Sequence, residues 1–144
     1  MRILVLNGPN LNLLGVREPG LYGTVDYNGL VALIQKECDR LGVEARFYQS
    51  NHEGDLVDAI QAARLDCDGI VLNPGAYTHT SIAILDALKA VALPAAEVHI
   101  TDINQREEFR KVSYAGMACQ AHFIGQGLAG YLNAVRWLAE THGK

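Results

Sequence analysis

Five short apolar runs alternate with segments of helical periodicity along almost the whole chain. The runs are too short for helices and are typical of buried strands. Strands that are apolar on both faces and alternate with helices predict a parallel sheet covered by helices. Right-handed crossovers then give an α/β fold, a flavodoxin-like, doubly wound five-stranded parallel sheet in a three-layer sandwich. The expected strands are "RILVLN" (2–7), "EARFYQS" (44–50), "CDGIVLN" (67–73), "AAEVHI" (95–100) and "AHFIG" (121–125).

The expected helices fill the intervals between these strands. Apolar residues recur at helical spacing from Leu30 to Leu41, with Asp26 or Asn28 as the candidate N-cap and Gly42 as the stop. The other expected helices are a segment at 53–65, one that Thr78 caps and that runs to about Val91, a short one at 103–109, and a last one with an apolar stripe over 128–139.

Length and charge limit the class of protein. The 144 residues suit one domain, residues 1–144, with a core of its own. A net charge of −4 with scattered basic residues argues against nucleic acid as a partner. No apolar run is long enough for a membrane span or a signal peptide, so we expect a cytoplasmic protein with no membrane partner. The chain has three cysteines, an odd number, and they lie far apart in the sequence, at Cys38, Cys67 and Cys119. This pattern favours buried thiols over disulfides or a zinc site.

In a doubly wound sheet, ligands bind beyond the carboxyl ends of the strands, so the segments after each strand matter most. The loop after the first strand has no GxGxxG and no Gly-Lys-Ser/Thr, and it offers no serine or threonine hydroxyl before Thr24 for a flavin phosphate. The third strand ends in Asn73, where a phospho-receiver needs an Asp. Nucleotide-binding and receiver functions are therefore disfavoured.

The first loop, "NGPNLNLLGVREPGLYG", instead offers Arg17 and Tyr22. A surface arginine and a half-buried tyrosine are the plain alternative. To act as a base at neutral pH, a tyrosine needs its pKa lowered from near 10 by roughly three units. This shift requires the site to prefer the phenolate by about 4 kcal/mol. A nearby guanidinium in a water-poor site supplies much of this. Gly15, Gly20 and Gly23 would allow the loop to close as a lid.

The fourth strand ends "EVHI", and its period of two places Glu97 and His99 on the same side. A carboxylate beside an imidazole fixes the tautomer and stabilises the cation, so His99 is a candidate general acid or base. A purely structural Glu–His pair stays open. A metal site is less well supported, because no second close pair of ligands accompanies the first.

Two further segments carry polar groups at the same edge. After the third strand, "NPGAYTHTS" offers Asn73, His79 and free N–H groups for an anion or polar ligand, although His79 also suits a core or an interface. Arg110 suits the binding of a carboxylate or hydroxyl, or a salt bridge to Glu107. We expect Arg106 to pair on the surface.

Several segments closely resemble the type II 3-dehydroquinate dehydratase family, in order and over essentially the whole chain. The resemblance implies dehydration of 3-dehydroquinate to 3-dehydroshikimate by trans-elimination through an enolate, in the shikimate or quinate pathway. It also implies no cofactor, a small-molecule substrate and a homododecamer, a tetramer of trimers. The matching segments are "LNGPNLNLLGVREPGLYG", "QSNHEGDLVDAI", "LNPGAYTHTSIAILDAL", "EVHITDINQREEFRKVSY" and "GQGLAGYLNAV".

The resemblance also implies a role for each matched position. Tyr22 is the base, Arg17 favours its phenolate, and His99 is the acid, oriented by Glu97. Asn10 holds a water that stabilises the enolate oxygen. The positions implied to contact substrate are Asn73, His79, Asp86, Ile100, Thr101 and Arg110, of which Asp86 acts across a subunit interface.

The residues agree with this chemistry. Elimination of water β to a ketone needs a base, a stabilised enolate and an acid for the departing hydroxyl. A Schiff-base route needs a lysine at the active edge, where only Lys111 falls.

A non-catalytic flavodoxin-like binding module is the alternative, but it needs no acid and base on opposite loops. The sequence departs from the family pattern at Leu85, where an arginine is common, at Asp102, which adds a charge, and in the less usual "DYNGL" at 26–30.

Overall fold

The computed structural model describes residues 1–16 and 25–143. Within them, five strands form one all-parallel sheet in the order β2-β1-β3-β4-β5. The predicted flavodoxin-like topology is confirmed, and each expected strand is present within two residues of its predicted bounds. The strands are β1 (Arg2–Asn7), β2 (Glu44–Gln49), β3 (Gly69–Asn73), β4 (Ala95–His99) and β5 (Ala121–Ile124).

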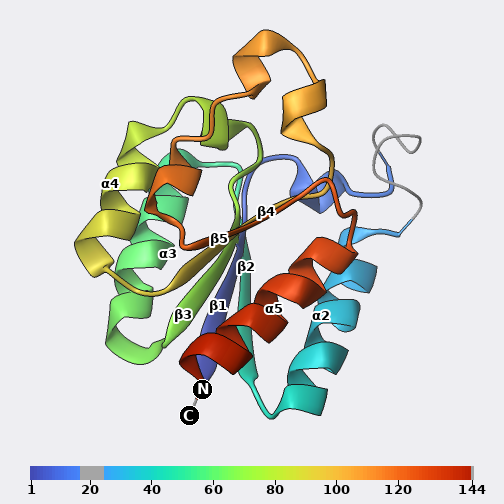
Figure 1. The fold of residues 1–144 in the computed structure, drawn as a ribbon, viewed down its shortest axis with the longest axis vertical. Coiled ribbons are helices and arrows are strands. Elements are labelled where there is room, and N and C mark those ends of the chain that lie inside the picture. Colours follow the sequence, from blue (N-terminus) through green and yellow to red (C-terminus); the bar gives the residue numbers. More distant parts are fainter. Residues whose placement is uncertain (17–24, 144) are drawn as a thin grey trace.

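Four α-helices in the described residues cover the two faces of the sheet, so the fold has three layers (Figure 1). Helices α2 (Tyr27–Leu41) and α5 (Ala129–His142) lie on one face. Helices α3 (Glu53–Asp66) and α4 (Ile82–Val91) lie on the other. No α-helix in this part of the chain is long and apolar enough to cross a membrane.

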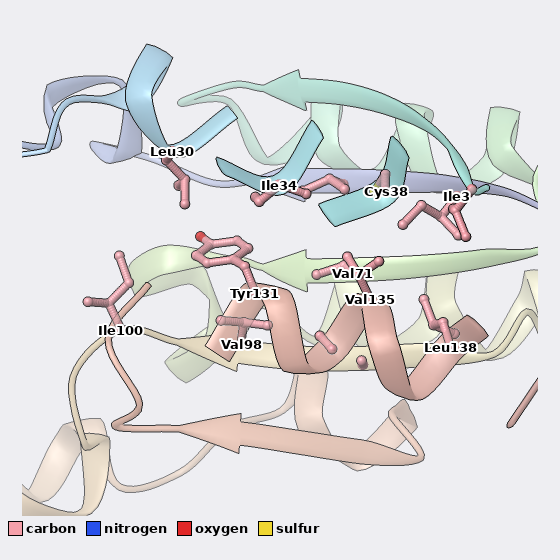
Figure 2. Close-up of a cluster of buried hydrophobic side chains, with 14 of the residues drawn as sticks. Ile3, Leu30, Ile34, Cys38, Val71, Val98, Ile100, Tyr131, Val135 and Leu138 are labelled. Carbon is pink, nitrogen blue, oxygen red and sulfur yellow. The ribbon is translucent and has the colours of Figure 1, made fainter. Parts of the chain in front are cut away.

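Each face of the sheet buries its own apolar cluster. Along β1, Ile3 and Val5 join the cluster under α2 and α5, whereas Leu4 and Leu6 join the one under α3 and α4. This is the alternation that a strand buried on both faces requires. Figure 2 shows the first cluster, where Tyr131 of α5 lies among apolar side chains of α2 and the sheet. Burial of each large aliphatic side chain contributes about 1.5–3 kcal/mol.

The ends of α2 follow the sequence. The carboxylate of Asp26 accepts a hydrogen bond from the backbone N–H of Gly29 at 2.8 Å, which makes Asp26 the N-cap. Gly42 ends the helix with a φ of 70°, a left-handed conformation that glycine adopts at little cost.

The predicted cap of α4 was wrong. The N-cap is Ser81, whose hydroxyl accepts a hydrogen bond from the N–H of Ile84 at 2.9 Å. Thr78 lies earlier, in a 3₁₀ helix at Gly75–His79, and its hydroxyl contacts that of Ser113 at 2.7 Å. The chain makes this short helix before α4 begins, so the later hydroxyl is the one placed to cap.

The predicted helix at 103–109 is instead two 3₁₀ turns, Ile103–Gln105 and Glu108–Arg110. The extended backbone of Arg106 separates them. The sequence analysis did not predict two other 3₁₀ helices, Leu11–Leu13 and Ala115–Ala118. All of these turns lie in connections, where the chain turns without continuing an α-helix.

The loops after β1 and β3 touch through their backbones. The N–H of Gly8 donates to the carbonyl of Asn73 at 2.8 Å. A Cβ at Gly8 would lie only 2.2 Å from the carbonyl oxygen of Pro74, so a larger residue does not fit without displacing one loop. This contact fixes the relative positions of Asn10 and Asn73, which follow and end these two strands.

We therefore expect Gly8→Ala to lower the free energy of unfolding by about 3 kcal/mol, because the added methyl overlaps backbone atoms. Chemical denaturation at a fixed protein concentration measures the change. Gly54→Ala is the matched control: its Cβ would meet nothing within 4 Å, and alanine in α3 is expected to raise stability by up to about 1 kcal/mol. Equal effects from the two substitutions would contradict the close contact.

Candidate active site

A cavity of about 140 Å³ lies at the carboxyl ends of β1, β3 and β4. This edge includes the point between β1 and β3 where the strand order reverses, the usual ligand site of a doubly wound sheet. Most of the predicted site residues line it. In the described part of the chain its walls are Pro9, Asn10, Leu11, Asn73, Gly75, Ala76, His79, His99, Ile100, Thr101, Ile103, Arg106 and Arg110.

Of the four other predicted residues, the structure describes two, Glu97 and Asp86, and Glu97 lies behind the lining residue His99. Arg17 and Tyr22 lie outside the described residues, so the predicted lid and its base stay predictions. Asp86 is exposed on α4 and does not line the cavity, and its implied role is across a subunit interface.

The predicted pair of Glu97 and His99 is present and buried, with 1% and 5% of each residue exposed. His99 Nε2 lies 2.8 Å from Oε2 of Glu97. An ionised carboxylate only accepts hydrogen bonds, so Nε2 carries a proton. The second ring nitrogen, Nδ1, is then the one that can exchange a proton with a ligand.

Glu97 receives two further donors. The hydroxyl of Ser113 donates to Oε2, and Nδ1 of His122 lies 2.6 Å from Oε1. Burial by itself raises the pKa of Glu97, but hydrogen bonds from His99, Ser113 and His122, with the charge of His99, lower it to about 2. The carboxylate therefore stays ionised at neutral pH and stabilises a positive charge on His99.

His79 also lines the cavity. Its Nδ1 lies 2.8 Å from the carbonyl oxygen of Val112, so Nδ1 carries the proton and Nε2 is free to accept one. Burial lowers the pKa of His79 more than this hydrogen bond raises it, and the nearby positive groups lower it further. A neutral His79 with a free Nε2 is suited to accept a hydrogen bond from a ligand hydroxyl.

Two arginines make the cavity positive. Arg110 lines it and also forms the salt bridge to Glu107, at 2.6 Å, that the sequence left open, while its binding of a carboxylate or hydroxyl stays a prediction. Arg106, which we expected to pair on the surface, also lines it. That prediction assumed one helix over 103–109, whereas the two short turns place both arginines at the cavity. Guanidinium groups of this kind bind carboxylates.

Asn73 is held from behind by a buried network. Its Nδ2 donates to the hydroxyl of Tyr131 at 2.8 Å, and that hydroxyl donates to Oδ1 of Asn7 at 2.7 Å. The N–H of Gly75 donates to Oδ1 of Asn73 at 3.1 Å. Because an amide carries two N–H donors, one remains for a ligand in the cavity.

Asn10 is held by its backbone. Its φ of 70° is left-handed, a conformation that asparagine adopts more readily than most residues. Its backbone N–H donates to Oδ1 of Asn51 at 3.0 Å. Asn10 is thereby placed on the cavity wall opposite β4.

Sequence reasoning missed three residues behind the cavity: Ser113, Tyr131 and His122. Tyr131 fell in the apolar stripe of the last helix, where its hydroxyl gave no separate signal. His122 stands opposite Glu97 in the β4–β5 register, which a parallel pairing of these strands could have revealed. Nothing in the sequence around Ser113 indicated its contact with Glu97.

Other parts of the described surface carry less chemistry. A more open depression of about 380 Å³ lies near the end of α4, lined mainly by apolar and backbone groups from residues 88–94 and 117–120. Nowhere in the described residues, the cavity included, is a group of three His, Cys, Asp or Glu side chains placed to hold a metal ion.

Comparison with known proteins decides the family. The model of the family described as dehydroquinase class II matches residues 1–139. The chain belongs to this family. A 3-dehydroquinate dehydratase from Lachnospira eligens is 52% identical over 137 residues, which cover 94% of this chain and 93% of the relative.

Solved class II dehydroquinase structures have the same fold. The type II dehydroquinase from Butyrivibrio crossotus is 51% identical, covers 96% of this chain and 97% of its own, and gives a TM-score of 0.94. The enzyme from Propionibacterium acnes is 42% identical, with 96% coverage of both chains and a TM-score of 0.93. The resemblance inferred from the sequence is confirmed, and this family member is an enzyme.

The depressed pKa of Glu97 predicts a pH dependence of stability. The native carboxylate binds a proton near pH 2, but the unfolded one does so near its ordinary value of 4.5. Its contribution is therefore present above about pH 4.5 and is lost as the pH falls toward 2, by about 3 kcal/mol. Denaturant unfolding from pH 6 to 3, at one protein concentration, should show a shallower decline for Glu97→Gln than for the parent. Parallel curves would contradict the assignment.

The network behind Asn73 predicts a second effect on stability. Tyr131→Phe removes the hydroxyl that accepts from Nδ2 of Asn73 and donates to Oδ1 of Asn7, so two buried amide atoms lose this partner and the free energy of unfolding should fall by about 2 kcal/mol. Tyr48→Phe, on the exposed face of β2, is the matched control and should stay within about 0.5 kcal/mol of the parent. A Tyr131→Phe variant as stable as the control would mean that the amides find other partners.

Proposed function

We propose that this chain, residues 1–144 acting as one catalytic domain, dehydrates 3-dehydroquinate to 3-dehydroshikimate. The observation that carries the proposal is the buried pair of His99 and Glu97 at the edge of a cavity with two arginines. Membership in the dehydroquinase class II family supports it, as do relatives named 3-dehydroquinate dehydratase.

The cavity offers a partner for each kind of group on this substrate, a cyclic ketone with hydroxyls and a carboxylate. Arg106 and Arg110 provide positive charge for the carboxylate. His79 Nε2 accepts from a hydroxyl, and Asn73 has a free N–H to donate. Ile100 and Thr101 follow β4 and complete the wall beside His99.

In the proposed reaction, Tyr22 takes the proton from the carbon α to the ketone, and the electron pair forms an enolate. Arg17 favours the phenolate form of Tyr22, and a water held at Asn10 stabilises the enolate oxygen. These roles of Arg17 and Tyr22 follow from the family resemblance.

Collapse of the enolate forms the new double bond and breaks the bond between the β-carbon and oxygen. His99 gives its Nδ1 proton to the departing hydroxyl, which leaves as water. The base on one loop and the acid on β4 suit a trans-elimination. Afterwards Tyr22 holds one extra proton and His99 lacks one, so one net proton transfer restores both. The ionised Glu97 lowers the cost of the cationic His99 that begins the cycle.

Acid, base and hydrogen bonds suffice for this elimination, so we propose that it uses no cofactor. We also propose, from the family resemblance, a homododecamer built as a tetramer of trimers, in which Asp86 reaches a neighbouring subunit. A cytoplasmic enzyme of the shikimate or quinate pathway fits the same reaction.

The test mixes purified protein with 3-dehydroquinate and follows the ultraviolet absorbance of the conjugated product. Tyr22→Phe should lower kcat by about 100-fold or more, because it removes the general base. Tyr48→Phe, on the edge strand β2, is the matched control and should keep the parent rate.

Three results are informative. Loss in the Tyr22 variant alone supports both the reaction and the base. Turnover by all three proteins keeps the reaction and removes Tyr22 as the base. No turnover by the parent would overturn the proposed function and favour a binding module with this fold.

A further inference from the structure

The two oxygens of the Glu97 carboxylate have unequal surroundings. Oε2 receives His99 Nε2 and the hydroxyl of Ser113. Oε1 receives Nδ1 of His122 at 2.6 Å, and among the described residues no other donor reaches it. The reaction proposed above assigns no role to His122.

His122 is placed opposite Glu97 by the sheet itself. The register of β4 and β5 pairs the two residues, and paired residues of neighbouring strands point to the same face. The side chain of Glu97 is 2% exposed, but that of His122 is 45% exposed. The imidazole therefore stands between the buried carboxylate and the protein surface.

The backbone closes another side of the carboxylate. A Cβ at Gly116 would lie 2.5 Å from Oε1, so the chain passes directly against this oxygen. The N–H of Gly116 donates to the Ser113 hydroxyl at 3.0 Å, which holds that hydroxyl in place. Glu97 is thus fixed from three directions, by His99, by Ser113 with Gly116, and by His122.

We propose that His122 is a positioning residue for the acid His99: its Nδ1–H holds Oε1 of Glu97 and thereby keeps Oε2 directed at His99. The acid role of His99 rests on the proposed function, but the positional role rests on the contacts alone. Without His122, a buried carboxylate oxygen loses its donor, which is costly. The carboxylate then turns to find another partner, and the bond to His99 weakens.

A proton relay from His99 through Glu97 to His122 is a different use of the same contacts. It requires Glu97 to take up a proton in passing. The pKa of Glu97, lowered to about 2, opposes this at neutral pH. The geometry therefore favours positioning over proton transfer.

Two substitutions separate the hydrogen bond from the imidazole. Asparagine has an N–H at the same distance along the side chain as Nδ1 of histidine, whereas leucine has a methyl group there. With 3-dehydroquinate, His122→Leu should lower kcat about tenfold with KM unchanged within about twofold. His122→Asn should restore kcat to within about threefold of the parent.

His142→Leu is the matched control. His142 is an exposed histidine at the end of α5, away from the strand ends that form the cavity, and its replacement should leave kcat and KM unchanged.

In a Glu97→Gln background, adding His122→Leu should cause no further loss of kcat, because His122 acts through that carboxylate. If His122 had a merely structural role, His122→Leu would lower kcat by the same factor in both backgrounds, and asparagine would not restore kcat.

The proposal would be overturned if His122→Leu had the same kcat as the parent, or if the His122→Asn variant were as slow as the His122→Leu variant.

A crystal structure of His122→Leu gives a readout that needs no turnover. Rotation of the Glu97 carboxylate away from His99 supports the positional role, and an unmoved pair overturns it. If the parent does not dehydrate 3-dehydroquinate, the proposed function fails, but the crystal structure of the His122→Leu variant still decides whether His122 positions Glu97.

Discussion

The carboxylate of Glu97 is a charge buried almost completely inside the protein, and the site is arranged around satisfying it. An unpaired buried carboxylate costs several kcal/mol, so the chain must bring donors to it from other elements. They come from β4 itself, from the segment before the 3₁₀ helix at Ala115–Ala118, and from β5. The need of this one carboxylate for hydrogen-bond donors thereby brings three separate segments of the chain together.

The other half of the site depends on backbone rather than charge. The loops after β1 and β3 meet where Gly8 passes Pro74, with no room for a side chain. That contact places Asn10 beside Asn73, and the tyrosine hydroxyl behind them fixes the orientation of the Asn73 amide. The cavity is therefore bounded by His99 of β4, which Glu97 holds in place, and by the junction of the loops that follow β1 and β3.

The sequence predicts the fold well because its signals are local and repeated. Apolar runs and helical stripes specify strands and helices one by one, and the crossover rule then sets their order. The pairing of Glu97 with His99 is also local, since it follows from the period of one strand. The cap at Ser81 was missed because three hydroxyl side chains, those of Thr78, Thr80 and Ser81, precede α4, and only the backbone conformation decides which of them caps the helix.

Contacts between distant segments were less accessible. His122 meets Glu97 only through the register of two strands, and the surroundings of Ser113 depend on a turn that has no periodic signal. Arg106 was assigned to the surface because charged residues on a short helix usually lie in solvent, whereas the observed turns place it at the cavity. The residues that sequence reasoning missed are thus those that support the site from behind.

The hydroxyl of Tyr131 has a consequence for the order in which the site forms. It joins Asn7 to the last helix across 124 residues of sequence, and through the same atom it orients Asn73. A chain emerging from the ribosome can pair β1 with β3 long before α5 exists, but the Asn73 amide then lacks the hydroxyl that accepts the hydrogen bond from its Nδ2. The C-terminal helix therefore completes the orientation of Asn73 at the cavity, and an unfinished or truncated chain holds most of the sheet without this part of the cavity wall in its final arrangement.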